Sequence, residues 1–488
     1  MRKIYKLISA IVLPATMLFA CSDDYLETDI TEFLSDKGLD EAAKYNPDLL
    51  NGSVAGLYTL MINRGTGGTT GHDDIGQKGY DIYSDLLSGD MVLTGVRYGW
   101  YEDVTRMKVT VNYSETENYR PWRYYYRIIF NANIIIDASV DENGKAKNDD
   151  VKHNLGQAKA MRAYAYYYLA NLYANEYNPS EPTLPLYTTV SDEAEPLATG
   201  KEVYDTIIQD LEDAKMYLAD FERGNEAGDK NIVNKDVVNG LLAYVYATTG
   251  DYAKAVAAAD AVISSSKYPI LPKDELTSNG FNNVSTPSWI WGFDIKLAND
   301  LDLRSWWGQM DIYTYSYAMA GDRKGMDHGL YKSIRDTDGR KDQFAASGGQ
   351  YLPINKFYHP ERKVGGQGDI TTDYVYMRIE EMYLLKAEAS AKAGDDATAK
   401  AALLELVSKR DSDPSYVSSL SGQALKDEIY KQLRIELWGE GKSYLAMKRN
   451  KATITREGHL FENISVPYND DRLTMEIPIQ EIQNNPHL

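Results

Sequence analysis

Residues 241–263 of the chain read LLAYVYATTGDYAKAVAAADAVI, and residues 384–406 read LLKAEASAKAGDDATAKAALLEL. The two segments have small residues at the same offsets, namely Ala243, Gly250 and Ala255 in the first and Ala387, Gly394 and Ala399 in the second. Each segment predicts a helix, a Gly-Asp turn and a second helix, because glycine readily takes the left-handed conformation at a helix end. The repeat therefore predicts a fold built mainly from pairs of α-helices.

Other stretches have the same helical period. Thr199 and Glu202 form the pattern of a capping box. An apolar stripe at helical spacing follows them, made of Val203, Ile207, Leu211, Ala214 and Leu218. Residues 157–173 predict another helix, and residues 423–449 predict a helix pair broken near Gly439. Repeated helix pairs with glycine at the turn are typical of tetratricopeptide units.

The segment from about 268 to 374 has a different composition. It is rich in Gly, Pro, Asn, Ser and aromatic residues, and it has little helical period. Residues 287–295, PSWIWGFDI, alternate as a β-strand does. We therefore expect a large insertion of loops and short strands in the helical scaffold, where a binding site is often found.

The N-terminus has the layout of an export signal. Arg2, Lys3 and Lys6 precede an apolar run over residues 7–20, which is too short to span a membrane, and Cys21 follows as the only cysteine. Residues 18–21, LFAC, resemble a lipoprotein box, and this resemblance implies cleavage before Cys21 and attachment of a diacylglycerol to it. The alternative is an ordinary secretory signal with a chance cysteine. We expect a signal peptide over residues 1–20 and a single domain over residues 21–488.

Composition excludes some functions. A net charge of -20 and a pI of about 4.8 argue against binding to nucleic acid or to an anionic membrane surface. An apolar content of 43% suffices for a substantial core, and most of the 39 Tyr residues are expected to be structural.

Motifs for catalysis, metal binding or cofactor binding are not apparent. The glycine-rich residues 64–79 have Gln77 and Lys78 where a phosphate-binding loop has Lys and a hydroxyl residue. Residues 335–342 miss the acidic spacing of an EF-hand calcium loop. The six histidines include no His-Glu-x-x-His, so we expect neither a metal nor a cofactor.

Several stretches together resemble the SusD-like (RagB-like) outer-membrane nutrient-binding lipoproteins. They are GTTGHDDIGQKGYDIYSDLLSGDMV (68–92), MRAYAYYYLANLY (161–173), MRIEEMYLLKAEASAKAG (377–394), LRIELWGEGKSYLAMKR (433–449) and IPIQEIQNNPHL (477–488). The likeness covers nearly the whole mature chain, and Asp338 and Arg340 match a structural Asp-x-Arg turn of the family.

This resemblance implies a fold of four tetratricopeptide-like helix pairs that supports an irregular region. It implies a lipid-anchored location at the cell surface of the outer membrane, and a partner, a SusC-like TonB-dependent barrel that the protein covers as a hinged lid. The implied role is the capture of oligosaccharides and their delivery to the barrel, without catalysis. Two alternatives remain open: a surface glycoside hydrolase, whose two carboxylates a sequence cannot locate, and a helical-repeat scaffold that binds peptides.

Aromatic residues outside the predicted helices are the candidate sugar-binding residues, because a sugar ring packs its C–H bonds on an aromatic face. The candidates are Tyr98, Trp100, Tyr101, Trp306, Trp307, Tyr313 and Tyr315, with Tyr358 in a third cluster. We expect Trp100, Trp306 and Trp307 to lie together on one exposed face. Candidate polar partners are Arg97, Asp103, Asn299, Asp302, Arg304 and Gln309. By contrast, Trp122, Trp289, Trp291 and Trp438 lie in strand-like or helical patterns and are expected in the core.

Overall fold

The fold is known from a computed structural model, which describes residues 48–488 apart from 225, 316, 346–348, 367 and 462. The predicted signal peptide and Cys21 lie outside the described residues. Residues from Leu50 to Leu488 form one compact unit. Within the described part of the chain, no helix is both long and apolar enough to cross a membrane.

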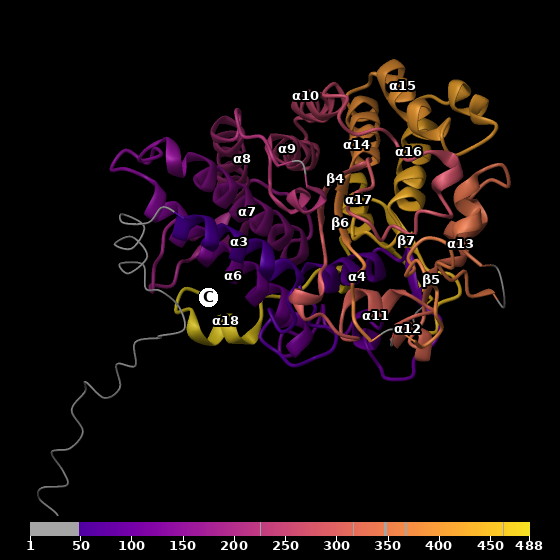
Figure 1. Cartoon of the computed structure of the whole chain (residues 1–488), viewed down its shortest axis with the longest axis horizontal. Coiled ribbons are helices and arrows are strands. Elements are labelled where there is room, and N and C mark those ends of the chain that lie inside the picture. Colours follow the sequence, from indigo (N-terminus) through magenta and orange to yellow (C-terminus); the bar gives the residue numbers. More distant parts are fainter. Residues whose placement is uncertain (1–47, 225, 316, 346–348, 367, 462) are drawn as a thin grey trace, which may run out of the picture. The chain divides into compact units, whose positions relative to one another are not determined.

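The scaffold consists of helices that follow one another along the chain (Figure 1). Those before the insertion are α3 (Asp48–Ile62), α4 (Gln77–Leu87), α5 (Glu102–Thr105), α6 (Thr116–Ser139), α7 (Asp149–Tyr173), α8 (Gly200–Tyr217), α9 (Lys235–Thr249) and α10 (Tyr252–Ile263). Those that follow it are α14 (Ile379–Lys392), α15 (Asp396–Val407), α16 (Gly422–Glu436), α17 (Ser443–Asn450) and α18 (Ile479–Asn484).

Within the described residues, consecutive helices pack against each other: α6 with α7, α7 with α8, α9 with α10, α14 with α15, and α16 with α17. Neighbouring pairs are joined by contacts of α8 with α9, of α10 with α14, and of α14 with α16. Figure 1 shows α8, α9, α10, α14 and α15 succeeding one another across the upper part of the molecule. The predicted fold, a mainly helical and tetratricopeptide-like scaffold, is confirmed.

The two predicted Gly-Asp turns connect the helices of two pairs. Gly250 ends α9 with a φ of 85°, and Gly394 follows α14 with a φ of 86°. In each case the next residue caps the second helix, since Asp251 accepts a hydrogen bond from the Lys254 amide and Asp395 accepts one from the Thr398 amide. An added Cβ at either glycine would meet no atom within 4 Å, so backbone conformation and not space requires glycine there.

The other helix predictions also hold. Thr199 and Glu202 form the reciprocal capping box at the start of α8, and the apolar stripe that follows is buried. The helix predicted from residue 157 begins earlier, at Asp149, because Asn148 caps it by accepting hydrogen bonds from two backbone amides.

Short antiparallel strand pairs join distant segments. Within the described residues they are β1 (Met91–Leu93) with β5 (Lys324–Met326), β2 (Pro182–Pro185) with β3 (Leu197–Thr199), β4 (Trp289–Phe293) with β6 (Tyr374–Arg378), and β7 (Thr453–Thr455) with β8 (Ser465–Pro467). The strand predicted over residues 287–295 is β4. Its partner β6 leads directly into α14, so this pair attaches the insertion to the scaffold.

The insertion also contains three short helices, α11 (Trp306–Met310), α12 (Tyr317–Ala320) and α13 (His328–Ser333). The β1–β5 pair brings the loop after β1 beside this part of the insertion, although more than 200 residues separate the two strands. This pairing positions the candidate site described below.

A buried network of charges joins the insertion to the scaffold helices. Glu436 of α16 accepts hydrogen bonds from Arg340 at 3.0 Å, from Arg378 at 2.7 Å and from Arg410 at 2.9 Å. Burial raises the pKa of Glu436, but the charges of Arg410, Arg378 and Arg340 outweigh burial and hold that pKa well below its usual value. Asp338 pairs with Arg340, so the Asp-x-Arg turn has the structural role expected of it. Burial of a charged side chain is costly, so these buried arginines and carboxylates need partners of opposite charge.

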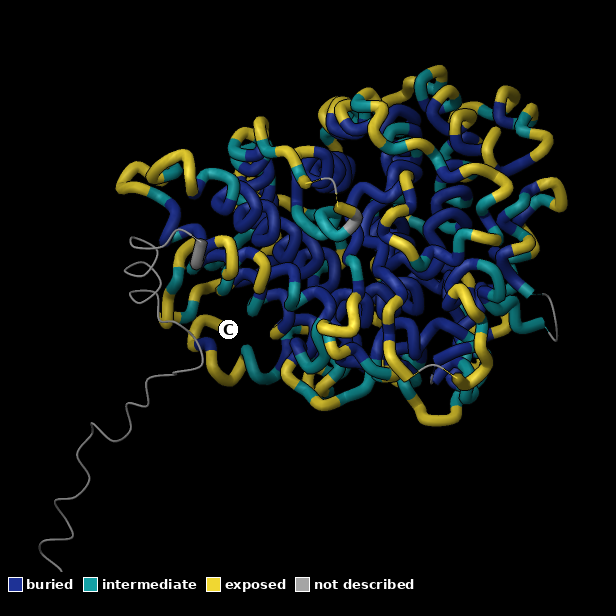
Figure 2. The backbone as a smooth tube through the Cα atoms, viewed as in Figure 1, coloured by how far each residue is buried: buried dark blue, intermediate teal, exposed yellow. Residues whose placement is uncertain are grey.

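The interior is dominated by apolar and aromatic side chains, while the exposed segments lie at the periphery (Figure 2). Tyrosines are a large part of this core, for example Tyr83, Tyr124 and Tyr125. The expectation that Trp122, Trp289, Trp291 and Trp438 are core residues is confirmed.

Candidate functional site

Four aromatic side chains from three separate segments meet at the surface, and we call them the aromatic cluster: Tyr98 and Trp100 in the loop after β1, His72 in the loop before α4, and Tyr317 in α12. Trp100 stacks on His72, with ring centroids 5.0 Å apart and planes inclined by 26°. Tyr317 makes edge contacts with Trp100 at 5.8 Å and with Tyr98 at 5.5 Å. Tyr98 is 56% exposed, Trp100 and His72 are half-buried, and Tyr317 is buried.

Backbone hydrogen bonds hold the loop that carries Tyr98 and Trp100. The amides of Arg97 and Tyr98 both donate to the Asp322 carboxylate, the second at 2.9 Å. Asp322 follows α12 and precedes β5, so the loop is tied to the same part of the insertion as Tyr317. The Tyr317 hydroxyl is in turn hydrogen-bonded to Nδ1 of His72.

The prediction that Trp306 and Trp307 lie on the exposed face with Trp100 is wrong. Their exposed fractions are 1% and 0%. The two indoles contact each other edge to face at 4.9 Å, and Trp306 contacts Phe357 in the same manner. They begin the short helix α11, which is capped by Ser305, and its side chains are buried in the core. The aromatic richness of this segment therefore reflects packing.

Two further candidates are buried as well. Tyr101 is 3% exposed, and its ring lies 5.0 Å from the Lys324 Nζ atom. Tyr315 is 1% exposed and faces His359. Both were predicted as sugar platforms, and burial rules out that role because their ring faces do not reach solvent. Tyr358 is also buried. Tyr313 is half-buried, with its hydroxyl donating to the Ile354 carbonyl, so its role stays a prediction, as do those of Tyr98 and Trp100.

A charged group flanks the aromatic cluster, and we call it the arginine triad: Arg64, Asp302 and Arg304. Arg304 donates to Asp302 through Nε at 3.0 Å and Nη2 at 2.8 Å, and Arg64 donates to the same oxygen, Oδ2. Burial raises the pKa of Asp302, but hydrogen bonds from Arg304 and the charge of Arg64 outweigh it and bring the pKa to about 2. Asp302 is therefore ionised at any physiological pH.

The triad acts on the cluster electrostatically. Burial lowers the pKa of His72, and the positive charges of Arg304 and Arg64 lower it further, while the carboxylates of Asp302 and Asp73 oppose this shift. Burial raises the pKa of the Tyr317 hydroxyl, while Arg304 opposes that rise. Both aromatic groups thus lie within electrostatic range of Arg304.

The sequence interpretation missed His72 and Arg64. His72 and Arg64 lie in or beside the glycine-rich stretch, which was interpreted only as a turn. Of the predicted polar partners, Asp302 and Arg304 lie near the cluster. Gln309 is buried, and it donates to the His72 carbonyl and accepts from Lys324. Asp103 pairs with Lys108 instead.

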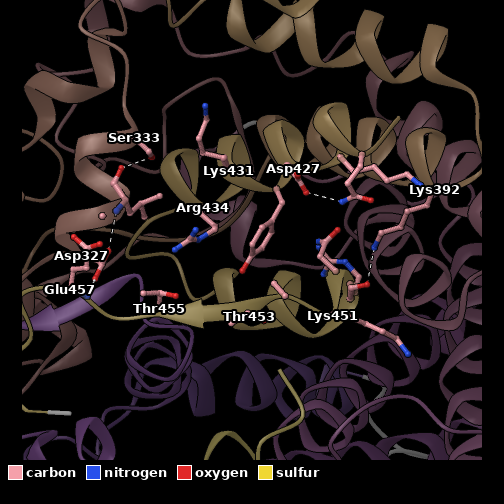
Figure 3. Close-up of a pocket in the computed structure, with 18 of the residues that line it drawn as sticks. Asp327, Ser333, Lys392, Asp427, Lys431, Arg434, Lys451, Thr453, Thr455 and Glu457 are labelled. Carbon is pink, nitrogen blue, oxygen red and sulfur yellow. Dashed lines mark hydrogen bonds between the residues drawn. The ribbon is translucent and has the colours of Figure 1, made fainter. Parts of the chain in front are cut away.

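The surface is also hollowed away from the aromatic cluster. A hollow of ≈ 810 Å³ is bordered by α13, α16, α17 and β7 (Figure 3). Among its cations, Arg434 pairs with Asp90, Lys431 with Glu428 and Lys451 with Glu176. None of the residues that line it belongs to the aromatic cluster or the arginine triad.

A second hollow of ≈ 770 Å³ has Tyr58, His153, Phe221 and Asn299 among its lining residues. Asn299, predicted as a polar partner of the sugar, therefore belongs to this hollow. Within the described part of the chain, no group of three or more His, Cys, Asp or Glu residues is arranged to hold a metal ion.

Comparison with known protein families shows to which family this chain belongs. A family described as "Starch-binding associating with outer membrane" matches residues 82–246, and the SusD family matches residues 309–488. The chain belongs to the SusD/RagB-like family. The two matches include α4, most of the scaffold helices, α12 and the loop of Tyr98 and Trp100.

Two SusD-like proteins of Formosa agariphila are similar to this SusD/RagB-like chain. One is 28% identical over 221 residues, which cover 43% of this chain but only 38% of the relative. The other is 25% identical over 383 residues, which cover 68% of this chain and 71% of the relative.

Solved structures of the same superfamily match almost the whole chain. A SusD-like carbohydrate binding protein from Bacteroides vulgatus has a TM-score of 0.75 at 23% identity, with 90% of this chain and 96% of that chain covered. A SusD superfamily protein from Bacteroides fragilis has a TM-score of 0.74 at 25% identity, with 91% and 98% covered. The first of these likenesses establishes the fold alone.

Proposed function

We propose that this SusD/RagB-like protein captures oligosaccharides on the aromatic cluster at the cell surface and passes them to a SusC-like TonB-dependent barrel without cleaving them. The observation that carries the proposal is the pairing of exposed Tyr98 with half-buried Trp100 beside the charged and polar groups of the arginine triad. A sugar ring needs both an aromatic face for its C–H bonds and polar partners for its hydroxyls.

The expected strength of binding fits a capture role. Each aromatic contact contributes about 0.5–1.5 kcal/mol beyond the area that it buries. A few such contacts with hydrogen bonds give dissociation constants from roughly micromolar to millimolar. A protein that must release its ligand to a transporter needs affinity in that range.

A binding role is also favoured over hydrolysis at this surface. A glycoside hydrolase needs one carboxylic acid with a raised pKa and a second carboxylate across the sugar. Asp302 has a pKa of about 2 and accepts hydrogen bonds from two arginines, so it is unsuited to donate a proton. The lipid anchor at Cys21 and the barrel partner belong to the proposal on the strength of the resemblance stated above.

Affinity electrophoresis in gels that contain plant, mucin-type or microbial polysaccharides tests the capture role. Wild-type protein without residues 1–21 should be retarded by at least one polysaccharide, and the Tyr98→Ala and Trp100→Ala variants should be retarded less. Tyr113→Ala is the matched control. Tyr113 is also an exposed tyrosine (42%), but it lies outside the aromatic cluster, and its backbone carbonyl accepts a hydrogen bond from the Ile479 amide. Equal retardation of all four proteins would place the site elsewhere.

Two further measurements test the remaining parts of the proposal. No reducing ends should appear in a polysaccharide that the protein retains, and steady release of them would favour the hydrolase alternative. The full-length protein should copurify from outer membranes with a TonB-dependent barrel. Isolation of the lipoprotein alone under mild detergent would contradict the proposed partner.

A further inference from the structure

The charge beside the aromatic cluster is opposite to that of the chain. The protein has a net charge of -20. In the arginine triad, however, one carboxylate serves two guanidinium groups, so the triad has a net positive charge. Arg97, next to Tyr98, adds another exposed cation, whose Nη1 donates to the Ala320 carbonyl at 3.4 Å, while the Asp322 carboxylate accepts from the amides of Arg97 and Tyr98.

Two cations also share one carboxylate in the hollow of ≈ 810 Å³, where Lys392 and Arg449 both pair with Glu388, but that carboxylate is buried. In the triad, Arg64 and Arg304 share a single oxygen of Asp302, whose side chain is 42% exposed. Two guanidinium groups held on one oxygen repel each other, and a second anion between them would relieve that repulsion.

The two guanidinium groups keep unused donors. A guanidinium has five N–H bonds in a planar fork. Among the described residues, Nη1 of Arg304 and both Nε and Nη2 of Arg64 have no hydrogen-bond partner, and the two side chains are 41% and 29% exposed. Such forks match a carboxylate or a sulfate in geometry as well as in charge.

We infer that the glycan bound by the aromatic cluster carries an anionic group, a uronic-acid carboxylate or a sulfate ester, that Arg64 and Arg304 bind while the sugar ring stacks on Tyr98 or Trp100. This inference rests on the proposed function. His72 stacks on Trp100, and the charges of both arginines act on its imidazole. The site thus combines the recognition of a sugar ring with that of an acid.

Paired probes that differ only in charge test the inference. The first pair is homogalacturonan oligosaccharides and their methyl esters, which mask the carboxylates. The second pair is chondroitin sulfate oligosaccharides and their desulfated forms, and starch and xylan oligosaccharides serve as neutral probes. Titration calorimetry should show that at least one charged probe binds tenfold or more tightly than its masked or desulfated counterpart, and the responding pair tells carboxylate from sulfate.

Substitutions connect that preference to the triad. Arg304→Gln and Arg64→Gln should each weaken the binding of the charged probe about tenfold and leave the melting temperature nearly unchanged, because both side chains are partly exposed. They should also reduce the salt dependence of binding, which the wild type should show because salt screens exposed charges. The matched control is Arg335→Gln, since Arg335 is also partly exposed and bonds to two carboxylates, buried Asp411 and exposed Asp413, but lies outside the triad.

The outcomes separate the inference from the function on which it rests. Three results would overturn the inference and leave the capture role intact. They are binding of neutral probes only, equal binding of the two probes within each pair, and binding of a charged probe that both arginine variants retain. Failure to bind any probe, charged or neutral, would contradict the capture role and the inference with it. Charged binding that requires Trp100 as well as Arg304 would support both.

Discussion

The indole of Trp100 and the imidazole of His72 are stacked, with their ring centroids 5.0 Å apart. The two residues come from different loops, one before α4 and one after β1, and α4 with β1 separates them in the chain. His72 thus covers one face of the indole, and a sugar ring would stack on its other face or on the exposed ring of Tyr98. This geometry gives His72 a role in supporting the platform.

Replacement of Trp100 and of Trp307 by alanine should have opposite consequences. Trp100→Ala should cost about 1–3 kcal/mol of glycan affinity with a small change in thermal stability, because few residues carry most of the energy of such a surface. Trp307→Ala should cost about 3–5 kcal/mol of folding free energy, because its indole is fully buried. Calorimetric binding and thermal unfolding of both variants check this, and early unfolding of Trp100→Ala would show that Trp100 is a core residue.

Removal of the Glu436 carboxylate should destabilise the fold strongly. Glu436→Ala would remove the carboxylate that Arg340, Arg378 and Arg410 share, and leave these three buried cations with fewer carboxylates than they need. Loss of one partner from such a network costs about 3–5 kcal/mol. Glu405→Ala on the exposed side of α15 is the control and should change stability by less than about 0.5 kcal/mol. Equal unfolding midpoints in urea for the two variants would contradict this account.

Replacement of glycine by alanine should lower stability at the two turns and raise it within a helix. Gly250→Ala and Gly394→Ala should each destabilise by roughly 1 kcal/mol, since alanine is strained at a φ near 85°. Gly56→Ala should stabilise by about 0.5–1 kcal/mol, because Gly56 lies inside α3 with free space around its Cα. Denaturant unfolding of the three variants measures these differences, and stabilisation by alanine at either turn would count against strain as the reason for glycine.

Glu388 should make stability depend on acid pH. Burial raises its pKa, but Arg449 and Lys392 outweigh burial and lower the pKa to about 2. A carboxyl group whose pKa is lower in the folded than in the unfolded state stabilises the fold at pH values above the unfolded-state pKa, here 4.5. This contribution, about 3 kcal/mol, is lost as the pH falls from 4.5 towards 2. Unfolding free energies of the wild type and Glu388→Gln should therefore differ at pH 6 and converge towards pH 2. A constant difference would refute the assignment.

The proposed lipid anchor gives a cellular prediction. Cys21→Ala should abolish the incorporation of labelled palmitate and release the protein from the outer membrane, because the thiol is the site of diacylglycerol attachment in a lipoprotein box. Labelling of intact cells and membrane fractionation measure both effects. Continued labelling of the variant would mean that the signal around Cys21 has been misassigned.

Local patterns were sufficient to predict the scaffold. Gly250 and Gly394 were predicted to end helices because a single residue with positive φ decides such a turn, and the neighbouring apolar residues have the helical period. The capping box of Thr199 and Glu202 and the strand around Trp289 are likewise decided by residues close together in the chain. Resemblance of whole motifs added the family, which the comparisons bear out.

The tertiary structure alone decided which aromatic side chains reach the surface. Trp100, Trp306 and Trp307 lie in similar aromatic-rich segments, yet only Trp100 is partly exposed, because α11 turns both of its tryptophans into the core. Tyr317 meets Trp100 because β1 pairs with β5, more than 200 residues later in the chain. Exposure is a property of long-range packing, whereas helix ends depend on local backbone conformation. That physical difference explains why the sequence by itself determined the scaffold, while the composition of the candidate site required the fold.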